Sequence, residues 1–191
     1  MSSTFTVYRG ISRREARDVL EEQRYFRDER VRFGNSKFGA HAVFGSGIYF
    51  IDDYEVAGQY AFCHAVHEND DCTVLRQTLT FKAPLILDTH YTEAELRTDV
   101  LRWRLGTDKV VEFTVAQEKT DIVLPESIRK YVLHHRYDGI IYLLPNGARY
   151  FISYFPEKQV RHIQIDYEFN LEEALYKTFS ELRQLKHKNV K

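Results

Sequence analysis

Apolar residues with a two-residue period alternate with helical patterns along the whole chain, and no Pro- or Gly-rich linker separates them. This mixture of strands and helices, with a hairpin near the C-terminus, predicts an α+β fold. The chain has 191 residues, and a domain averages about 150 residues. We therefore expect a single domain over residues 1–191.

The individual elements follow from local signals. Strands are expected at Thr4–Tyr8, Ile48–Ile51, Cys72–Phe81, Leu85–Leu87, Val110–Val115, Ile140–Leu144, Tyr150–Tyr154 and Val160–Tyr167. Helices are expected to begin at Ser12, at Asp52 or Asp53, at Thr92, at Glu126 and at Leu171, and the last of them is predicted as one amphipathic helix up to Leu185. Ser12 with Glu15, and Thr92 with Glu95, have the spacing of capping boxes.

Composition excludes several classes of protein. The net charge of −1 argues against a dedicated nucleic-acid binder. Cys63 and Cys72 lack paired His residues at ligand spacing, so no metal site is expected, and so few cysteines favour a reducing compartment. No apolar run approaches the roughly 20 residues of a membrane helix. Met1 to Arg9 lacks the apolar region of a signal peptide. We expect a cytoplasmic protein, or one delivered into a host or target cell without a cleavable signal.

Tyr8-Arg9-Gly10, at the end of the first expected strand, is a candidate ligand-binding segment. Arginine offers a planar charged fork to a phosphate or a carboxamide, and glycine lets a ligand approach the backbone closely. The alternative is an Arg in a surface ion pair and a Gly in a turn.

A second candidate segment runs from Gly45-Ser46-Gly47 into a strand that carries Tyr49 and then a helix that carries Tyr60. Two aromatic rings in such positions could hold a flat heteroaromatic ring between them. Gly47 is a further candidate for contact with such a ligand. The alternative is that both tyrosines belong to the core.

Asn146-Gly147 is a strong signal for a hairpin turn between the strands Ile140–Leu144 and Tyr150–Tyr154. Together with this hairpin, which follows Asp138-Gly139, and the final Val160 strand, these segments resemble the ADP-ribosyltransferase superfamily. The Gly-Ile-Tyr-Phe segment, with a second Tyr eleven positions after Tyr49, is similar to the nicotinamide-stacking segment of the poly(ADP-ribose) polymerase and diphtheria-toxin branch. Tyr8-Arg9-Gly10 is instead similar to the arginine branch. The resemblance covers most of the chain and implies a split β-sandwich with flanking helices.

The resemblance implies NAD⁺ as the substrate and roles for particular residues. Tyr49 and Tyr60 would clamp the nicotinamide ring, the Gly10 backbone would hold its carboxamide, and Arg9 would bind phosphate or ribose. Tyr8 and Gly47 would line the same site. The implied activity is transfer of ADP-ribose to a macromolecular acceptor, more often a protein than a nucleic acid, by a bacterial or phage effector or toxin.

One signature of that superfamily is missing. A Glu usually opens a late strand and stabilises the ribose as nicotinamide leaves, but here that strand begins Arg149-Tyr150-Phe151. Glu118 is the first candidate to replace it, so the expected catalytic residues are Arg9, Tyr49 and Glu118. The less favoured acids are Glu112, Glu126 and Glu157, and each of these carboxylates has the alternative of a solvated surface position.

The missing acid leaves two further functions open. The chain could be a catalytically inactive relative that binds NAD⁺, ADP-ribose or a protein. It could also be an NAD glycohydrolase, with water as the acceptor.

Overall fold

The computed structural model describes residues 2–25, 42–106 and 120–188. Seven strands and seven helices alternate in this part of the chain, which confirms the α+β class. The strands form one mixed sheet in the order β4-β5-β6-β2-β1-β3-β7. They span β1 Ser3–Ser12, β2 Ile48–Ile51, β3 Cys72–Phe81, β4 Pro84–Leu87, β5 Gly139–Leu143, β6 Arg149–Ser153 and β7 Val160–Phe169.

The sheet is narrowest at its middle, where β1 and β2 meet. Their register contains the single pair Tyr8–Ile51, whereas β1 and β3 pair along their whole length from Ser3–Phe81 to Ser12–Cys72. The sheet therefore consists of two groups of strands, β4-β5-β6-β2 and β1-β3-β7, joined at one point. The strands thus form one hydrogen-bonded sheet with a narrow join, which does not confirm the expected split β-sandwich.

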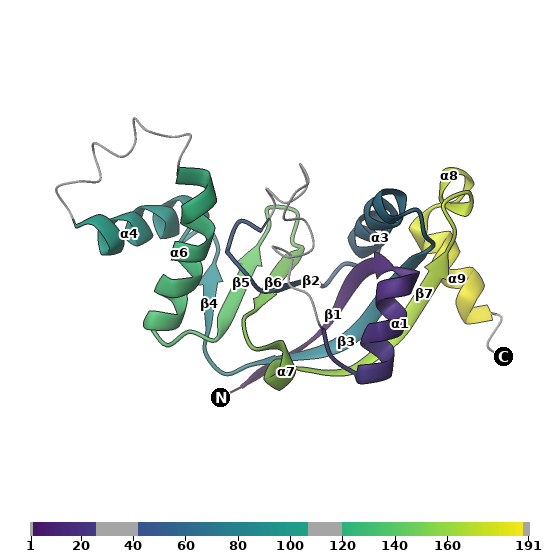
Figure 1. The fold of residues 1–191 in the computed structure, drawn as a ribbon, viewed down its shortest axis with the longest axis horizontal. Coiled ribbons are helices and arrows are strands. Elements are labelled where there is room, and N and C mark those ends of the chain that lie inside the picture. The colour runs from purple at the N-terminus through teal and green to yellow at the C-terminus, as the bar shows by residue number, and fades with distance from the viewer. Residues whose placement is uncertain (1, 26–41, 107–119, 189–191) are drawn as a thin grey trace.

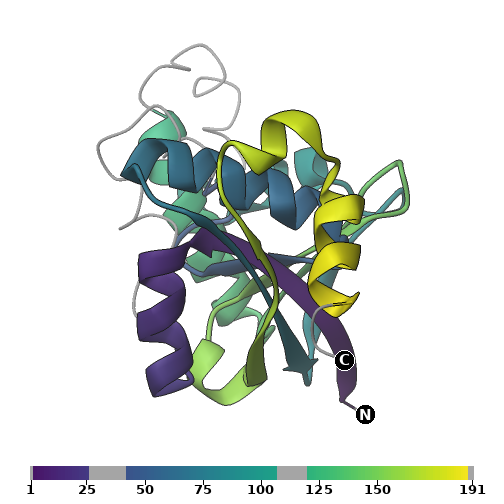
Figure 2. The ribbon, with the colours of Figure 1, turned by 90° about the vertical axis from the view of Figure 1, so that its right-hand side faces the viewer.

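Helices cover the two groups separately (Figure 1). Helices α4 Glu93–Leu105 and α6 Thr120–His134 pack against β4, β5 and β6. Helices α1 Arg13–Glu22, α3 Tyr54–Glu68, α8 Glu173–Tyr176 and α9 Phe179–Lys188 lie with the other group, and α7 Pro156–Gln159 connects β6 to β7. Figure 2 shows α1 and α9 on opposite sides of β1, β3 and β7.

The core follows this division only in part. Val7 and Ile11 of β1 pack with Ala16 and Val19 of α1 in a cluster that also includes residues of β2, β5 and β6, so this cluster joins the two groups of strands. A second cluster joins α3 and α9 to β3 and β7, and a third joins α4 and α6 to the strands β4 to β6. The pocket described below lies between these groups.

Capping explains where the helices begin. The Asp53 carboxylate accepts hydrogen bonds from the N–H groups of Glu55 and Val56, at 2.8 and 3.2 Å, and so starts α3. Thr92 and Glu95 form the predicted capping box of α4. Ser12 accepts from the N–H of Glu15 at 3.4 Å, so the predicted start of α1 is also confirmed.

Two predicted helices are wrong in extent. The expected helix over Leu171–Leu185 is two helices, because Thr178 and Glu181 cap a new helix start between them. The helix expected from Glu126 begins at Thr120 and contains Pro125 within it. The predicted strand over Val110–Val115 lies outside the described residues.

Candidate functional site

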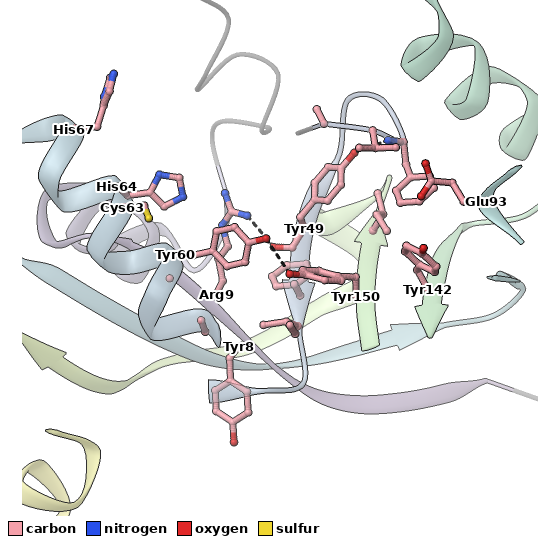
Figure 3. A pocket seen from close by; sticks show the side chains of 18 residues that line it. Tyr8, Arg9, Tyr49, Tyr60, Cys63, His64, His67, Glu93, Tyr142 and Tyr150 are labelled. Atoms are coloured by element: carbon pink, nitrogen blue, oxygen red, sulfur yellow. Dashed lines mark hydrogen bonds between the residues drawn. The ribbon is translucent and has the colours of Figure 1, made fainter. Parts of the chain in front are cut away.

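A pocket of about 400 Å³ opens where β1 and β2 diverge. β1 and β2 are antiparallel, and beyond the pair Tyr8–Ile51 they no longer pair. The residues that follow on β1, Arg9 and Gly10, and those that precede on β2, Phe50 and Tyr49, line this gap. Helix α3 closes one side of the pocket, and β5, β6 and the start of α4 contribute the other (Figure 3). The single join in the sheet therefore creates the site.

Arg9 bridges the gap between the two strands. Its Nη1 donates to the carbonyl oxygen of Tyr49 at 2.8 Å, and its guanidinium carbon lies 5.3 Å from the centre of the Tyr25 ring. The side chain is only 4% exposed. A permanently charged guanidinium is thus held inside the pocket wall, where it can meet an anionic ligand.

Tyr49 and Tyr60 line the same pocket from opposite sides. The Tyr49 phenol donates to the carbonyl of Gly45 at 2.8 Å and accepts from the N–H of Phe44 at 3.1 Å, so the preceding loop fixes its ring. Tyr60, on α3, is 44% exposed. The pocket therefore has one anchored aromatic wall and one that faces the opening.

Tyr150 is a pocket residue that the sequence analysis did not select. Its phenol oxygen lies 2.9 Å from that of Tyr60, with the two rings at 81° to each other (Figure 3). The preceding residue, Arg149, is bound to Asp52 through both its Nε, at 2.6 Å, and its backbone N–H, at 2.8 Å. Tyr150 thus lines the pocket at the start of β6, where the resemblance to the superfamily implies a glutamate.

The two candidate glycines pack against protein backbone. A Cβ on Gly10 would overlap the backbone of Ala57 and Ala61, so this glycine allows α3 to lie directly on β1. A Cβ on Gly47 would lie 3.0 Å from the carbonyl oxygen of Ser153, and Gly47 is not among the residues that line the pocket. Backbone packing therefore accounts for both glycines, and of the two only Gly10 borders the pocket.

Tyr8 borders the pocket, but its side chain points away from the other labelled residues in Figure 3. Its ring packs edge-on against Tyr54, with 6.1 Å between ring centres, and under the guanidinium of Arg183. Tyr8 can therefore contribute only backbone to a ligand in this pocket.

Only some of the candidate acids belong to the described part of the chain. Glu118 and Glu112 lie outside the described residues, so their role stays a prediction. Glu126 pairs with Arg129 at 3.1 Å, and neither Glu126 nor Glu157 lines the pocket. Among the described lining residues Glu93, the first residue of α4, is the only carboxylate.

Helix α3 adds three further side chains that the sequence analysis did not select. His64, which is 7% exposed, lines the pocket together with His67 and the exposed thiol of Cys63. These residues fall within about one turn of α3, and that spacing was the signal that could have identified them. His64 and His67 add imidazole rings to the end of the pocket that Arg9 lines.

In the described ranges no three or more His, Cys, Asp or Glu side chains are grouped so that they could hold a metal ion. Within the same residues no helix is both long and apolar enough to cross a bilayer.

Fold and site together define an α+β protein with an aromatic pocket at a break in its sheet. No family model matches the chain, and no curated protein matches it. Among solved structures it is similar to a chain of the crystal structure of the M. tuberculosis MbcT–MbcA toxin–antitoxin complex. The identity is 16% and the TM-score 0.46, over 96% of this chain and 91% of that chain. A similarity at this level assigns neither a family nor an activity.

Proposed function

We propose that the protein binds NAD⁺ in this pocket, cleaves the bond between nicotinamide and ribose, and transfers ADP-ribose to a macromolecular acceptor. The observation that carries the proposal is the arrangement of Tyr49, Tyr60 and Arg9 around one pocket. Two aromatic side chains beside a buried guanidinium suit a ligand that combines a flat ring with phosphates. The resemblance in sequence to the ADP-ribosyltransferase superfamily supports the same ligand and the same fold family.

Each proposed role follows from the chemistry of the group. The nicotinamide ring lies between Tyr49 and Tyr60, and its carboxamide pairs with the backbone at Gly10, along the edge of β1 that β2 leaves unpaired. Arg9 binds phosphate or ribose. These contacts fix the ring while the glycosidic bond breaks, and its electron pair passes to the ring nitrogen of nicotinamide.

The weak point of this site is charge stabilisation at the ribose. Bond cleavage leaves an oxocarbenium-like ribose, which a nearby carboxylate stabilises. Tyr150 can hydrogen-bond a ribose hydroxyl but supplies no full charge. Loss of one such stabilising group typically costs about 10²–10³ in rate. We expect turnover to be slow unless Glu118 or another acid reaches the ribose.

The presence of Tyr150 at the opening of β6 favours one second candidate, a non-catalytic module that binds NAD⁺ or ADP-ribose. The role of an effector or toxin, and a protein as the acceptor, rest on the resemblance in sequence alone.

Incubation with NAD⁺, with and without a cell lysate, tests the proposal through release of nicotinamide. The transferase predicts release that increases with lysate and a labelled macromolecule. Release that is equal without lysate indicates the glycohydrolase, and thermal stabilisation by NAD⁺ without release indicates the binding module. Neither release nor stabilisation would refute NAD⁺ as the ligand.

Substitutions of the two pocket tyrosines test whether nicotinamide release takes place in this pocket. Tyr49→Ala and Tyr60→Ala should each abolish nicotinamide release, whereas Tyr176→Phe, at a residue on α8 that is 79% exposed, should keep wild-type release. Full release by both alanine variants, with their thermal midpoints unchanged, would refute the ring-binding role.

A further inference from the structure

The pocket has opposite charge at its two ends. Arg9, His64 and His67 lie at the α3 end, and Glu93 with Tyr142 lies at the α4 end, with Tyr49 between them (Figure 3). A ligand that fills the pocket from end to end therefore meets the guanidinium of Arg9 on one side and the carboxylate of Glu93 on the other. Diphosphate belongs at the first end by charge, so the second end must bind something other than phosphate.

Glu93 is held in place by groups outside the pocket. Arg97, one turn further along α4, donates from Nε at 2.9 Å and approaches with Nη2 at 2.8 Å, and both nitrogens contact the same oxygen, Oε1. The side chain remains 27% exposed. One carboxylate oxygen is therefore engaged by Arg97, and the other does not bind that arginine.

Aromatic residues surround this carboxylate. Tyr142 packs edge-on against Phe44, with 5.7 Å between ring centres, and both line the pocket. Burial, then the charge of Glu93 and a hydrogen bond to its carboxylate, raise the pKa of Tyr142, so its phenol stays protonated and shares this carboxylate with any ligand. A flat ring that enters this end thus meets two aromatic side chains and one acceptor of hydrogen bonds.

We propose that the α4 end of the pocket binds an NH₂ group of the bound dinucleotide, with Glu93 as its acceptor. The inference rests on the proposed function and extends it to the orientation of the substrate and to the nucleotides that the site accepts. An ionised carboxylate can only accept hydrogen bonds, so Glu93 selects NH₂ and disfavours an oxygen at the same place. The contact between Glu93 and this NH₂ group determines specificity and lies away from the bond that breaks.

NAD⁺ carries two such groups, the 6-amino group of adenine and the carboxamide of nicotinamide. The proposed function pairs the carboxamide with the backbone at Gly10, so Glu93 is assigned to the 6-amino group of adenine. Two analogues test this assignment. Nicotinamide hypoxanthine dinucleotide has a carbonyl oxygen in place of the adenine amine, and nicotinic acid adenine dinucleotide has a carboxylate in place of the carboxamide.

The test measures Kd by calorimetry for NAD⁺ and both analogues, with wild-type protein, Glu93→Gln and Glu93→Asp. Wild-type protein should bind nicotinamide hypoxanthine dinucleotide about 10- to 100-fold more weakly than NAD⁺, since the hydrogen bond to the Glu93 carboxylate is lost and a carbonyl oxygen faces that carboxylate instead. Glu93→Gln, whose amide can donate, should remove most of that difference. Glu93→Asp keeps the charge and serves as the second variant if the glutamine protein does not fold.

Glu95→Gln is the matched control, because Glu95 is exposed on the same helix and lies outside the pocket lining. It should leave all three Kd values unchanged. Equal wild-type affinity for NAD⁺ and nicotinamide hypoxanthine dinucleotide, or a preference for NAD⁺ over this analogue that Glu93→Gln leaves intact, would overturn the inference while the proposed function stands. No measurable binding of NAD⁺ would instead overturn the proposed function and this inference with it.

Discussion

At the scale of single residues, the labelling rates of the two cysteines can show whether a ligand occupies the pocket. Cys63 is exposed on α3 and lines the pocket, whereas Cys72 is fully buried. Burial raises the pKa of Cys72 to about 12, and the thiolate is the reactive form of cysteine. The chain has no other cysteine.

We expect iodoacetamide to modify one thiol of the folded protein, that of Cys63, and saturating NAD⁺ to slow the reaction at least several-fold by covering it. Mass spectrometry of peptides after timed quenching measures both. Cys63→Ser should take up no label before unfolding. Equal labelling rates with and without NAD⁺ would show that the ligand does not occupy the α3 side of the pocket.

At the scale of elements, the contact between β1 and α3 explains why a glycine stands at position 10. The sequence alone suggested that this glycine makes room for a ligand, but α3 occupies the space where a Cβ would lie. The same helix carries Tyr60 and His64. Packing of α3 on β1 is therefore a condition for the pocket as well as for the core.

Gly10→Ala should lower the free energy of unfolding by about 1–3 kcal/mol, because the extra methyl must push α3 away from β1. Chemical denaturation without any ligand measures this change. Gln59→Ala, at an exposed position of α3, should stay close to wild type. Wild-type stability in Gly10→Ala, combined with loss of NAD⁺ binding, would assign the glycine to the ligand alone.

The elements also show how far local sequence signals extend. Capping residues located the starts of α1, α3 and α4, because a cap is a local hydrogen-bonding pattern. The break between α8 and α9 was hidden by an apolar periodicity that runs through Thr178. The proline at position 125 predicted a helix start at Glu126, yet α6 begins at Thr120 and contains Pro125 beyond its first turn, where proline cannot donate the usual backbone hydrogen bond.

The candidate site was predictable only where its residues are close in sequence or carry a recognised pattern. Arg9, Tyr49 and Tyr60 were found in this way. Tyr150 lines the pocket because of the strand order, and Glu93 lines it because of the packing of α4. No local sequence pattern predicts either arrangement. Glu93 looked like any acid in the first turn of a helix.

At the scale of the whole molecule, exposed carboxylates at turns and helix starts make the fold sensitive to acid. Backbone N–H groups hold the pKa of Asp88, Glu95 and Glu181 below the usual value. At Asp70 burial acts in the opposite direction, but hydrogen bonds from the backbone of Arg14 and Asp71 outweigh it and lower the pKa. A lowered folded-state pKa gives stability above the unfolded pKa and loses it as pH falls.

The thermal midpoint should therefore fall as the pH is lowered from about 5 to about 3, the range in which these carboxyls protonate. Differential scanning calorimetry across this range measures it. Glu95→Gln should reduce the drop, since glutamine also fits the capping box but does not titrate there. A midpoint that is constant over the range would contradict the assigned hydrogen bonds.

The most direct test of the account is a crystal structure of the protein grown with NAD⁺. The account predicts the nicotinamide ring between the side chains of Tyr49 and Tyr60, in the gap that β1 and β2 leave open, with the diphosphate near Arg9. A dinucleotide bound elsewhere, with neither tyrosine touching its pyridine ring, would contradict it.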